Sequence, residues 1–183
     1  GIDSEVRMAV EKMIDQLKAS GAEIVPVTLP HTEYAVATYY VVAVSEASSN
    51  LSRFDGVRFG VRPKEALEAK NPADFYKKVR ANFGPEVKRR IILGTFALSS
   101  GFYDAYYRRA SQVRRLMRED FEAAFEKVDV MVSPVCPTTA FKLGEKSKNP
   151  LQMYLSDIFT IPASMAGLPC MSVPVGKDAQ GLS

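Results

Sequence analysis

The sequence predicts an α/β fold in which helices cover a largely parallel sheet, and two neighbouring segments carry this prediction. Between Phe102 and Val128, apolar residues recur every three or four positions, so they lie on one face of a long helix. The helix leads directly into residues 129–133, which are too short and too apolar for another helix and are stopped by Pro134. A fully apolar strand after a long helix is typical of a sheet that is covered on both faces.

Local signals at the start of the chain predict a helix followed by a strand. Asp3 or Ser4 can cap the helix, and Gly21 can end it in a left-handed conformation. Residues 22–29 are predicted as a strand near the edge of the sheet, because Pro26 lacks a backbone donor. A helix, a glycine and a strand in this order form an α/β unit.

The middle of the chain is predicted to be helical and then loop-like. Residues 33–49 are predicted as a buried helix, although Tyr39 and Tyr40 also favour β structure and periodicity alone leaves both open. Residues 50–85 are polar and loop-like, with a short helix over 72–82. The remaining predicted elements are a basic turn at 87–90, a loop at 142–149, a helix at 150–159 and a last strand at 171–175.

Composition and charge fit one globular core. Of the 183 residues, 46% are hydrophobic and 25% are charged, as in ordinary globular domains. The net charge of +3 is too small to indicate a polyanionic partner. No run of about 18 apolar residues could span a membrane, and the start does not resemble a signal peptide, so we expect a cytoplasmic protein.

The two ends indicate a piece of a longer chain. The sequence starts at Gly1 rather than at a methionine. It stops at Ser183, after a turn-rich stretch at 176–181 where a hairpin would begin its return strand. We therefore expect a partial domain that is truncated at both ends.

Few residues can carry chemistry by themselves. A Ser-His-Asp triad lacks its base, because the only histidine, His31, is expected to be a cap or a surface residue. The motifs of serine hydrolases, metalloproteases and nucleotide-binding loops are absent. Cys136 and Cys170 lack the spacing of a metal site and are expected to be buried, reduced thiols. No metal site is predicted.

The basic residues of the long helix could form a phosphate-binding stripe or a solvated face. The solvated face is favoured, because Arg115 and Glu119, like Arg118 and Glu122, are spaced for ion pairs between successive turns. From the residues alone, the sequence indicates no more than part of a soluble α/β domain.

Several motifs resemble those of the amidase-signature family, and most closely those in the second half of the glutaminase subunits of tRNA-dependent amidotransferases. They cover nearly the whole chain and are YY at 39–40, EASSNLSRFDGVR at 46–58, KRR at 88–90, GTFALSSG at 94–101, DAYY at 104–107, PVCPTT at 134–139 and AGLPCMSVP at 166–174. The resemblance implies a partial α/β/α fold with a mixed central sheet flanked by helices. Residues 1–183 would form a single partial domain, the C-terminal half of the family's domain, with a helix at Tyr39.

The same resemblance implies where the chemistry lies. Family members hydrolyse glutamine with a lysine, a bridging serine and a serine nucleophile, and all three would belong to the missing first half, so no catalytic residue is expected here. Matched motifs assign Arg90 to the α-carboxylate of glutamine, Asp157 to its α-ammonium and Tyr39 to the pocket wall. A guanidinium and a carboxylate are the natural partners of these two charges. Arg89 is the alternative to Arg90.

The implied function is to supply ammonia for the conversion of Glu-tRNA(Gln) to Gln-tRNA(Gln). The implied partners are amidotransferase subunits B and C, the missing N-terminal half and, through the complex, tRNA. No cofactor is expected in this chain, whereas ATP and Mg²⁺ are expected at one of the partner proteins. Two alternatives remain: a fragment of another amidase-signature hydrolase, and a basic RNA-contacting module.

Overall fold

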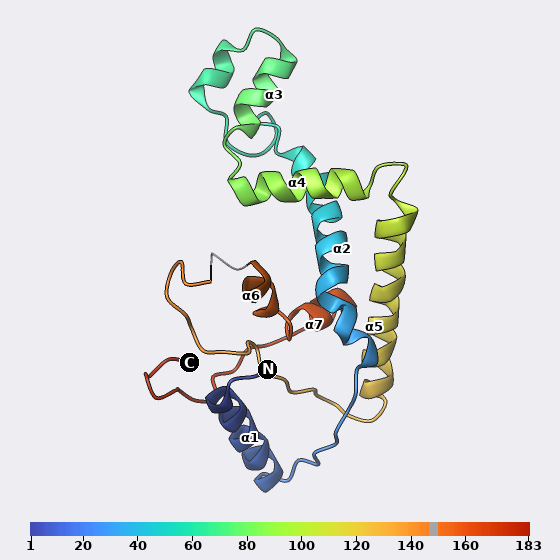
Figure 1. Ribbon diagram of the computed structural model, residues 1–183, viewed down its shortest axis with the longest axis vertical. Helices are drawn as coiled ribbons and strands as arrows, with labels where there is room; N and C mark the ends of the chain where they lie inside the picture. Colours follow the sequence, from blue (N-terminus) through green and yellow to red (C-terminus); the bar gives the residue numbers. More distant parts are fainter. Residues whose placement is uncertain (147–149) are drawn as a thin grey trace. The chain divides into compact units, whose positions relative to one another are not determined.

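The computed structural model describes residues 1–146 and 150–183, which form two compact units. Unit 1 comprises residues 1–38 and 112–183, and unit 2 comprises residues 39–111. The α-helices are α1 (Ser4–Ala19), α2 (Ala35–Asn50), α3 (Pro72–Arg80), α4 (Pro85–Ala97), α5 (Arg109–Phe125), α6 (Pro150–Leu155) and α7 (Ile161–Ala166) (Figure 1). Helices α2 and α5 each contain residues of both units. None of the described helices is both long and apolar enough to span a membrane.

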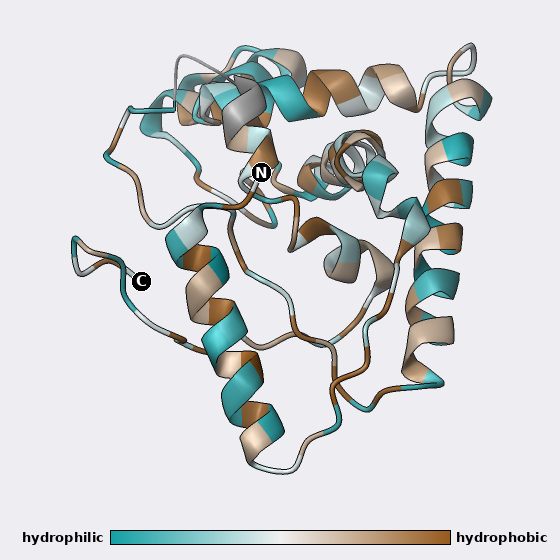
Figure 2. Ribbon diagram, turned by 60° about the horizontal axis from the view of Figure 1, so that its bottom comes forward, coloured by the Kyte–Doolittle hydropathy of each residue, from teal (hydrophilic) through white to brown (hydrophobic). Residues whose placement is uncertain are grey.

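The predicted mixed central sheet is wrong for the described residues, which contain no β-strand. The segments 22–29, 129–133 and 171–175 are irregular, and no backbone hydrogen bond joins any of them to another. Strands exist only as pairs, because each needs a partner for its backbone N–H and C=O groups. Val130 is 75% exposed and Met171 is 85% exposed. Figure 2 shows such hydrophobic residues along the irregular segments between the helices.

The first helix and its caps confirm the sequence prediction. The Asp3 side chain accepts a hydrogen bond from the backbone N–H of Glu5 at 2.8 Å, which satisfies one of the free donors at the start of α1. Gly21, just beyond the helix, has a φ of +96°. A residue without Cβ adopts this left-handed conformation at little cost.

His31 is neither a cap nor a free surface residue, in contrast to the sequence expectation. It lies in a short 3₁₀ helix, η1 (Pro30–Tyr34). Its Nδ1 lies 2.9 Å from one carboxylate oxygen of Asp120, and its backbone N–H donates to the other at 2.8 Å. The two contacts join η1 to α5 across 89 positions of sequence.

Helix α5 supplies the buried stripe of unit 1 that its periodicity predicts. Met117, Phe121 and Ala124 are buried at successive turns. On the same helix, Arg114 Nε donates to the carbonyl of Met165 in α7 at 2.8 Å. The predicted long helix is shorter at its start, because residues 104–108 form a π-helical segment, η4 (Asp104–Arg108). The two predicted ion pairs are present, between Arg115 and Glu119 at 2.8 Å and between Arg118 and Glu122 at 2.7 Å.

Unit 2 is built around the crossing of α2 and α4 (Figure 1). The confirmed helix α2 contributes Val44, whose carbonyl oxygen would lie only 2.0 Å from a Cβ added at Gly94 of α4. The side chains of Ser48 and Thr95 meet beside this point, with their oxygens 3.1 Å apart. A glycine at position 94 therefore allows the two backbones to touch.

The four remaining expectations have different outcomes. The basic residues 88–90 lie within α4 rather than in a turn. The short helix predicted over 72–82 is confirmed as α3, whereas the helix predicted over 150–159 ends at Leu155. The loop predicted over 142–149 lies partly outside the described residues.

Candidate functional site

The start of α4 positions the candidate carboxylate-binding arginine. Gly84 precedes the helix, and Pro85 occupies its first position, where the missing N–H costs nothing. Glu86 follows in the first turn. Arg89 and Arg90 lie three and four residues later, so both side chains reach back over the first turn toward Glu86.

Glu86 binds both arginines. Its carboxylate accepts hydrogen bonds from Arg89 Nε at 2.9 Å and Arg89 Nη2 at 3.0 Å. It also accepts one from Arg90 Nε at 2.9 Å. The hydrogen bonds from Arg89, and to a smaller extent that from Arg90, lower the pKa of Glu86 to about 2. The carboxylate is therefore ionised at neutral pH and restricts the orientation of both guanidinium groups.

Arg90 and Tyr39, two of the three predicted site residues, are in contact. Arg90 Nη1 donates to the Tyr39 hydroxyl of α2 at 3.4 Å, and Arg90 is partly buried. Hydrogen bonds to Glu86 and Tyr39 raise the pKa of the Arg90 guanidinium above its ordinary value. Its second terminal nitrogen, Nη2, has no partner among the described residues. This arrangement leaves donors that could bind a carboxylate.

Asp157, the third predicted site residue, belongs to unit 1. It lies in the turn between α6 and α7, where its carbonyl accepts the backbone N–H groups of Thr160 and Ile161 at 3.1 and 3.0 Å. Its side chain is exposed, and the carboxylate has no partner in the described part of the chain. The backbone of Asp157 is thus held by the turn, and its charge remains available to a cation.

A lysine connects this turn to the preceding loop. Lys146 Nζ lies 3.2 Å from the Ser156 hydroxyl and 3.3 Å from that of Thr138. The same ammonium lies 3.9 Å from the centroid of the Phe141 ring, close enough for a cation–π interaction. These contacts restrain the residue just before Asp157.

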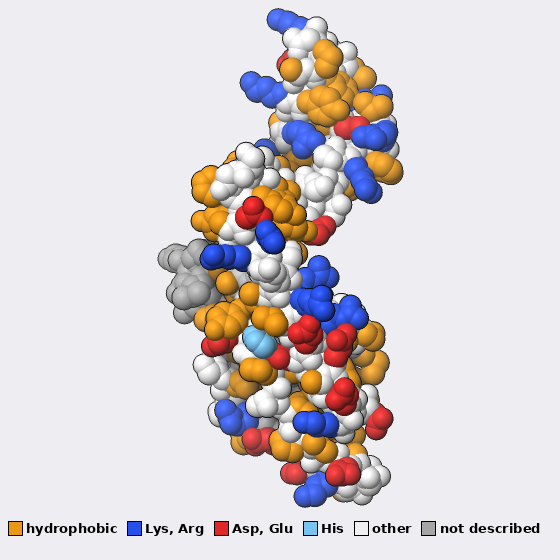
Figure 3. Space-filling model, turned by 90° about the vertical axis from the view of Figure 1, so that its right-hand side faces the viewer, with side chains coloured by type: hydrophobic (Ala, Val, Ile, Leu, Met, Phe, Trp, Pro, Cys, Tyr) orange, Lys and Arg blue, Asp and Glu red, His pale blue; other side chains and the backbone are white. Residues whose placement is uncertain are grey.

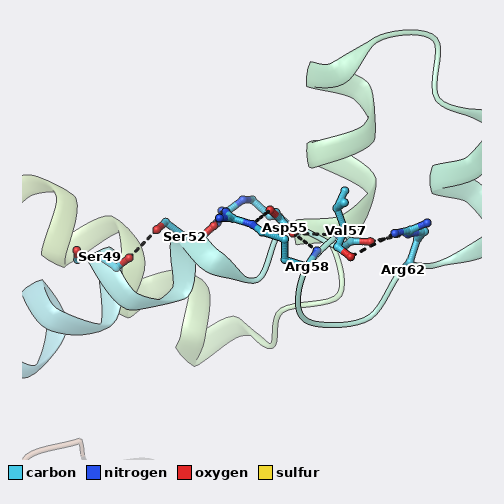
Figure 4. Close-up of polar contacts among 8 residues, drawn as sticks. Ser49, Ser52, Asp55, Val57, Arg58 and Arg62 are labelled. Carbon is cyan, nitrogen blue, oxygen red and sulfur yellow. Dashed lines mark hydrogen bonds and ion pairs between the residues drawn. The ribbon is translucent and has the colours of Figure 1, made fainter.

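The loop that follows α2 contains a buried acid that the sequence reasoning did not single out. Figure 4 shows Asp55 accepting hydrogen bonds from its own loop. The backbone N–H groups of Val57 and Arg58 donate to one carboxylate oxygen at 2.9 Å each, and Arg58 Nε donates to the other at 2.9 Å. These bonds, the backbone ones foremost, hold the pKa of Asp55 well below its usual range.

A sequence signal for this arrangement existed. An Asp-Gly pair between longer segments is a strong turn signal, and the aspartate of such a turn commonly accepts backbone N–H groups two and three residues ahead. Gly56 has a φ of +74°, and its carbonyl accepts Arg62 Nε. These contacts hold together the first part of the predicted loop.

No metal site is formed by the described residues, which contain no group of three or more potential ligands. Cys136 and Cys170 are free thiols, as expected. Cys136 is partly buried, but Cys170 is exposed, so the expectation of two buried cysteines is wrong for Cys170. Cys170 immediately precedes segment 171–175, which does not pair as a strand. In the predicted sheet, neighbouring strands and helices would have covered Cys170.

Comparison with known proteins gives a consistent result along the chain. The A subunit of the glutamyl-tRNA(Gln) amidotransferase of Acidobacterium capsulatum is 58% identical over 183 residues, which is 100% of this chain and 38% of that protein. The protein of the same name from Zymomonas mobilis is 54% identical over 183 residues, or 100% of this chain and 37% of that protein. The chain thus spans well under half of the length of these relatives.

A solved structure and a family model agree with these relatives. The crystal structure of the glutamyl-tRNA(Gln) amidotransferase A subunit from Thermotoga maritima superposes with a TM-score of 0.64 at 37% identity, and the match covers 99% of this chain and 34% of that one. The model of the Amidase family matches residues 1–183. Because this match spans the entire sequence, the chain belongs to the amidase family.

Proposed function

We propose that this chain is the substrate-pocket half of the glutaminase subunit of a tRNA-dependent amidotransferase. The complete subunit would release ammonia from glutamine for the conversion of Glu-tRNA(Gln) to Gln-tRNA(Gln). The observation that carries this proposal is the full-length similarity of the chain to amidotransferase A subunits, at 58% identity in the case of Acidobacterium capsulatum. Similarity at this level along every segment favours a shared role over a shared fold alone.

We propose that Arg90, Tyr39 and Asp157 contact the glutamine substrate. Arg90 has donors left for the α-carboxylate of glutamine, and its contact with Tyr39 restrains it. Asp157 has an exposed carboxylate for the α-ammonium. Two opposite charges on the protein match a zwitterionic substrate, whereas a simple amide would need neither.

The residues that cleave the amide bond would lie outside this chain. We propose that a lysine and two serines in the remaining part of the subunit form the nucleophilic site. The subunit would act in the cytoplasm in a heterotrimer with subunits B and C, and tRNA, ATP and Mg²⁺ would be bound by its partners. This division of labour is supported by the match of the whole chain to only 38% of the A subunit of Acidobacterium capsulatum, which leaves most of such a subunit outside these residues.

We further propose that the predicted strands form when the remaining part of the subunit is present. Segments 129–133 and 171–175 expose apolar side chains and unpaired backbone groups, and both features are removed by pairing within a sheet. Hydrogen exchange tests this. Amides of both segments should exchange slowly in the complete subunit and rapidly in the 183-residue chain, and equal exchange in the two proteins would rule the pairing out.

Substrate analogues test the proposed pocket. In the complete subunit, Asp157→Asn should reduce kcat/KM for glutamine by roughly ten- to a hundred-fold, the value of one charged hydrogen bond. It should leave hydrolysis of glutaramate, which lacks the α-ammonium, nearly unchanged. An equal loss with both amides would show that Asp157 acts on folding rather than on the ammonium.

A further inference from the structure

The positive charge of the chain is concentrated in unit 2. Residues 39–111 carry 13 Lys and Arg against 7 Asp and Glu, a net charge of +6, whereas the rest of the chain carries 11 against 14, a net charge of −3. A surface with one sign of charge selects partners of the opposite sign. Figure 3 shows basic side chains interspersed with hydrophobic ones in its upper part, which α3 and its flanking segments form.

A groove of about 400 Å³ lies between α3 and α4 within this unit. Its lining is mostly apolar and includes Phe83, Ile91 and Ile92. Three cations line it as well, namely Lys77, Arg80 and Lys88. An apolar groove bordered by like charges is suited to a ligand with an apolar body and acidic flanks.

Among these three cations, Lys77 interacts with the Asp74 carboxylate at a distance beyond that of an ion pair. None of them forms an ion pair with a carboxylate in the described part of the chain. Two are held by uncharged carbonyl groups: Lys88 Nζ donates to Ala81 at 2.9 Å, and Arg80 Nη2 donates to Ser52 at 3.5 Å. Their positions are thereby restrained while their charges stay available to a partner.

The apolar surface continues from the groove along α4. Ile92 is 69% exposed, and Phe96, one helical turn later, is 47% exposed. The ring centroid of Phe96 lies 4.2 Å from that of Phe102 and 6.0 Å from that of Tyr106. Both of these neighbouring side chains are exposed. Exposed apolar side chains that lie close together mark an interaction surface rather than an ordinary solvated face.

The groove is better suited to a protein segment than to a nucleobase. Bases bind by stacking on free aromatic faces. In this groove the Arg80 guanidinium already lies over the ring of Phe83, at 5.8 Å, and over that of Tyr76, at 5.9 Å. The remaining lining around Ile91 and Ile92 is aliphatic, which favours the apolar side chains of a polypeptide.

We propose that the α3–α4 groove docks an acidic, apolar segment of a partner protein, and that the Ile92–Phe96 face extends this interface. The inference rests on the proposed function only in that this function places the subunit in a complex with other proteins. Aspartate or glutamate side chains of the segment pair with Lys77, Arg80 and Lys88, and its apolar side chains enter the groove.

Site-specific photocrosslinking tests the proposal in the assembled complex. Benzoylphenylalanine is introduced at position 92 of the complete subunit, which is produced together with its partners. Position 67 serves as the matched control, because Leu67 belongs to the same unit and is 70% exposed but does not line the groove. Crosslinking at position 92, and not at 67, should join a partner segment that mass spectrometry identifies as apolar and rich in carboxylates.

Charge reversal provides a second, quantitative test. Lys77→Glu combined with Lys88→Glu should weaken assembly with the partner by roughly ten- to a hundred-fold, because the introduced glutamates repel the carboxylates of the docked segment. Lys64→Glu combined with Lys70→Glu changes the net charge equally at exposed positions outside the groove and should have little effect. Equal weakening by both pairs would show that only the overall charge of unit 2 matters.

The outcomes separate this inference from the proposed function. If the complex converts Glu-tRNA(Gln) but position 92 crosslinks to RNA, to its own chain or to nothing, the groove inference fails and the proposed function stands. If the complex is inactive as an amidotransferase and position 92 still crosslinks to an acidic partner segment, the proposed function fails and the groove inference is supported.

Discussion

At the scale of single residues, Arg90 combines a restrained position with free donors. Its Nε donates a hydrogen bond to Glu86 and its Nη1 donates one to Tyr39. Its Nη2 has no partner among the described residues. Its neighbour Arg89 forms a two-point ion pair with Glu86. The two adjacent arginines therefore provide a matched comparison between the proposed substrate-binding residue, Arg90, and a neighbour that is paired with Glu86.

Replacement of each arginine by alanine should separate these roles. In the complete subunit, Arg90→Ala should lower kcat/KM for glutamine by roughly ten- to a hundred-fold, since a hydrogen bond between charged groups is worth about 1.5 to 3 kcal/mol. Arg89→Ala should have a much smaller effect. Similar small losses from both substitutions in a steady-state glutaminase assay would remove Arg90 from the site.

Glu86 predicts a dependence of stability on pH. Its pKa falls from an ordinary value of 4.5 to about 2 in the folded chain, so its ionised form favours folding. Its contribution is complete above pH 4.5 and is lost as the pH falls toward 2. Because its side chain is 52% exposed, solvent screening limits this contribution to about 1 kcal/mol or less.

Thermal unfolding of the complete subunit between pH 6 and pH 3 measures this contribution. The Tm of the wild type should fall more steeply over this range than that of Glu86→Gln, which has no group to titrate at this position. Parallel curves for the two proteins would mean that the arginines contribute nothing through Glu86.

At the scale of elements, the crossing of α2 and α4 brings Tyr39 and Arg90 together. Val44 and Gly94 touch through backbone atoms, so any side chain at position 94 pushes the helices apart. The separation matters for the candidate site, because Tyr39 and Arg90 lie on the same two helices and their contact is already 3.4 Å long. The packing of Val44 against Gly94 therefore affects the distance between Tyr39 and Arg90.

Gly94→Ala should destabilise the fold by about 1 to 3 kcal/mol, the usual cost of overpacking, despite a gain of up to about 1 kcal/mol in helix propensity. Gly101→Ala is the matched control, since a Cβ there meets no atom within 4 Å. Chemical denaturation of the complete subunit measures both. A neutral Gly94→Ala variant would show that the helices separate without cost.

At the scale of the whole molecule, binding groups and catalytic groups are proposed to lie in different parts of the subunit. Arg90 and Asp157 could hold glutamine, but binding alone lowers the free energy of the substrate without lowering the barrier above it. Hydrolysis also needs an activated nucleophile and an oxyanion site. We propose that both of these lie in the remaining part of the subunit.

The 183-residue chain by itself should therefore hydrolyse no glutamine. A glutaminase assay on the purified chain, and then on the chain mixed with a separately produced remainder of the subunit, measures this. Activity only in the mixture would support a pocket built from both parts. Hydrolysis by the chain alone would place the nucleophile within residues 1–183.

Much of the helical structure and the family could be predicted from the sequence. Caps such as Asp3, the glycine after α1 and the apolar stripe of α5 are local features, and local features act over a few residues whatever the rest of the molecule does. The ion pairs of Arg115 and Arg118 follow in the same way from the spacing within one helix. Motifs such as those at 39–40, 46–58 and 88–90 were sufficient to predict the family, which the family model confirms.

Other features depend on residues far apart in the sequence, and only the tertiary structure decided them. The pairing of His31 with Asp120, the backbone contact at Gly94 and the proximity of Tyr39 to Arg90 have no local signature. The sheet is the clearest case. The apolar pattern of 129–133 and 171–175 permits strands, but a strand needs a neighbour for its hydrogen bonds, and the described residues offer it none.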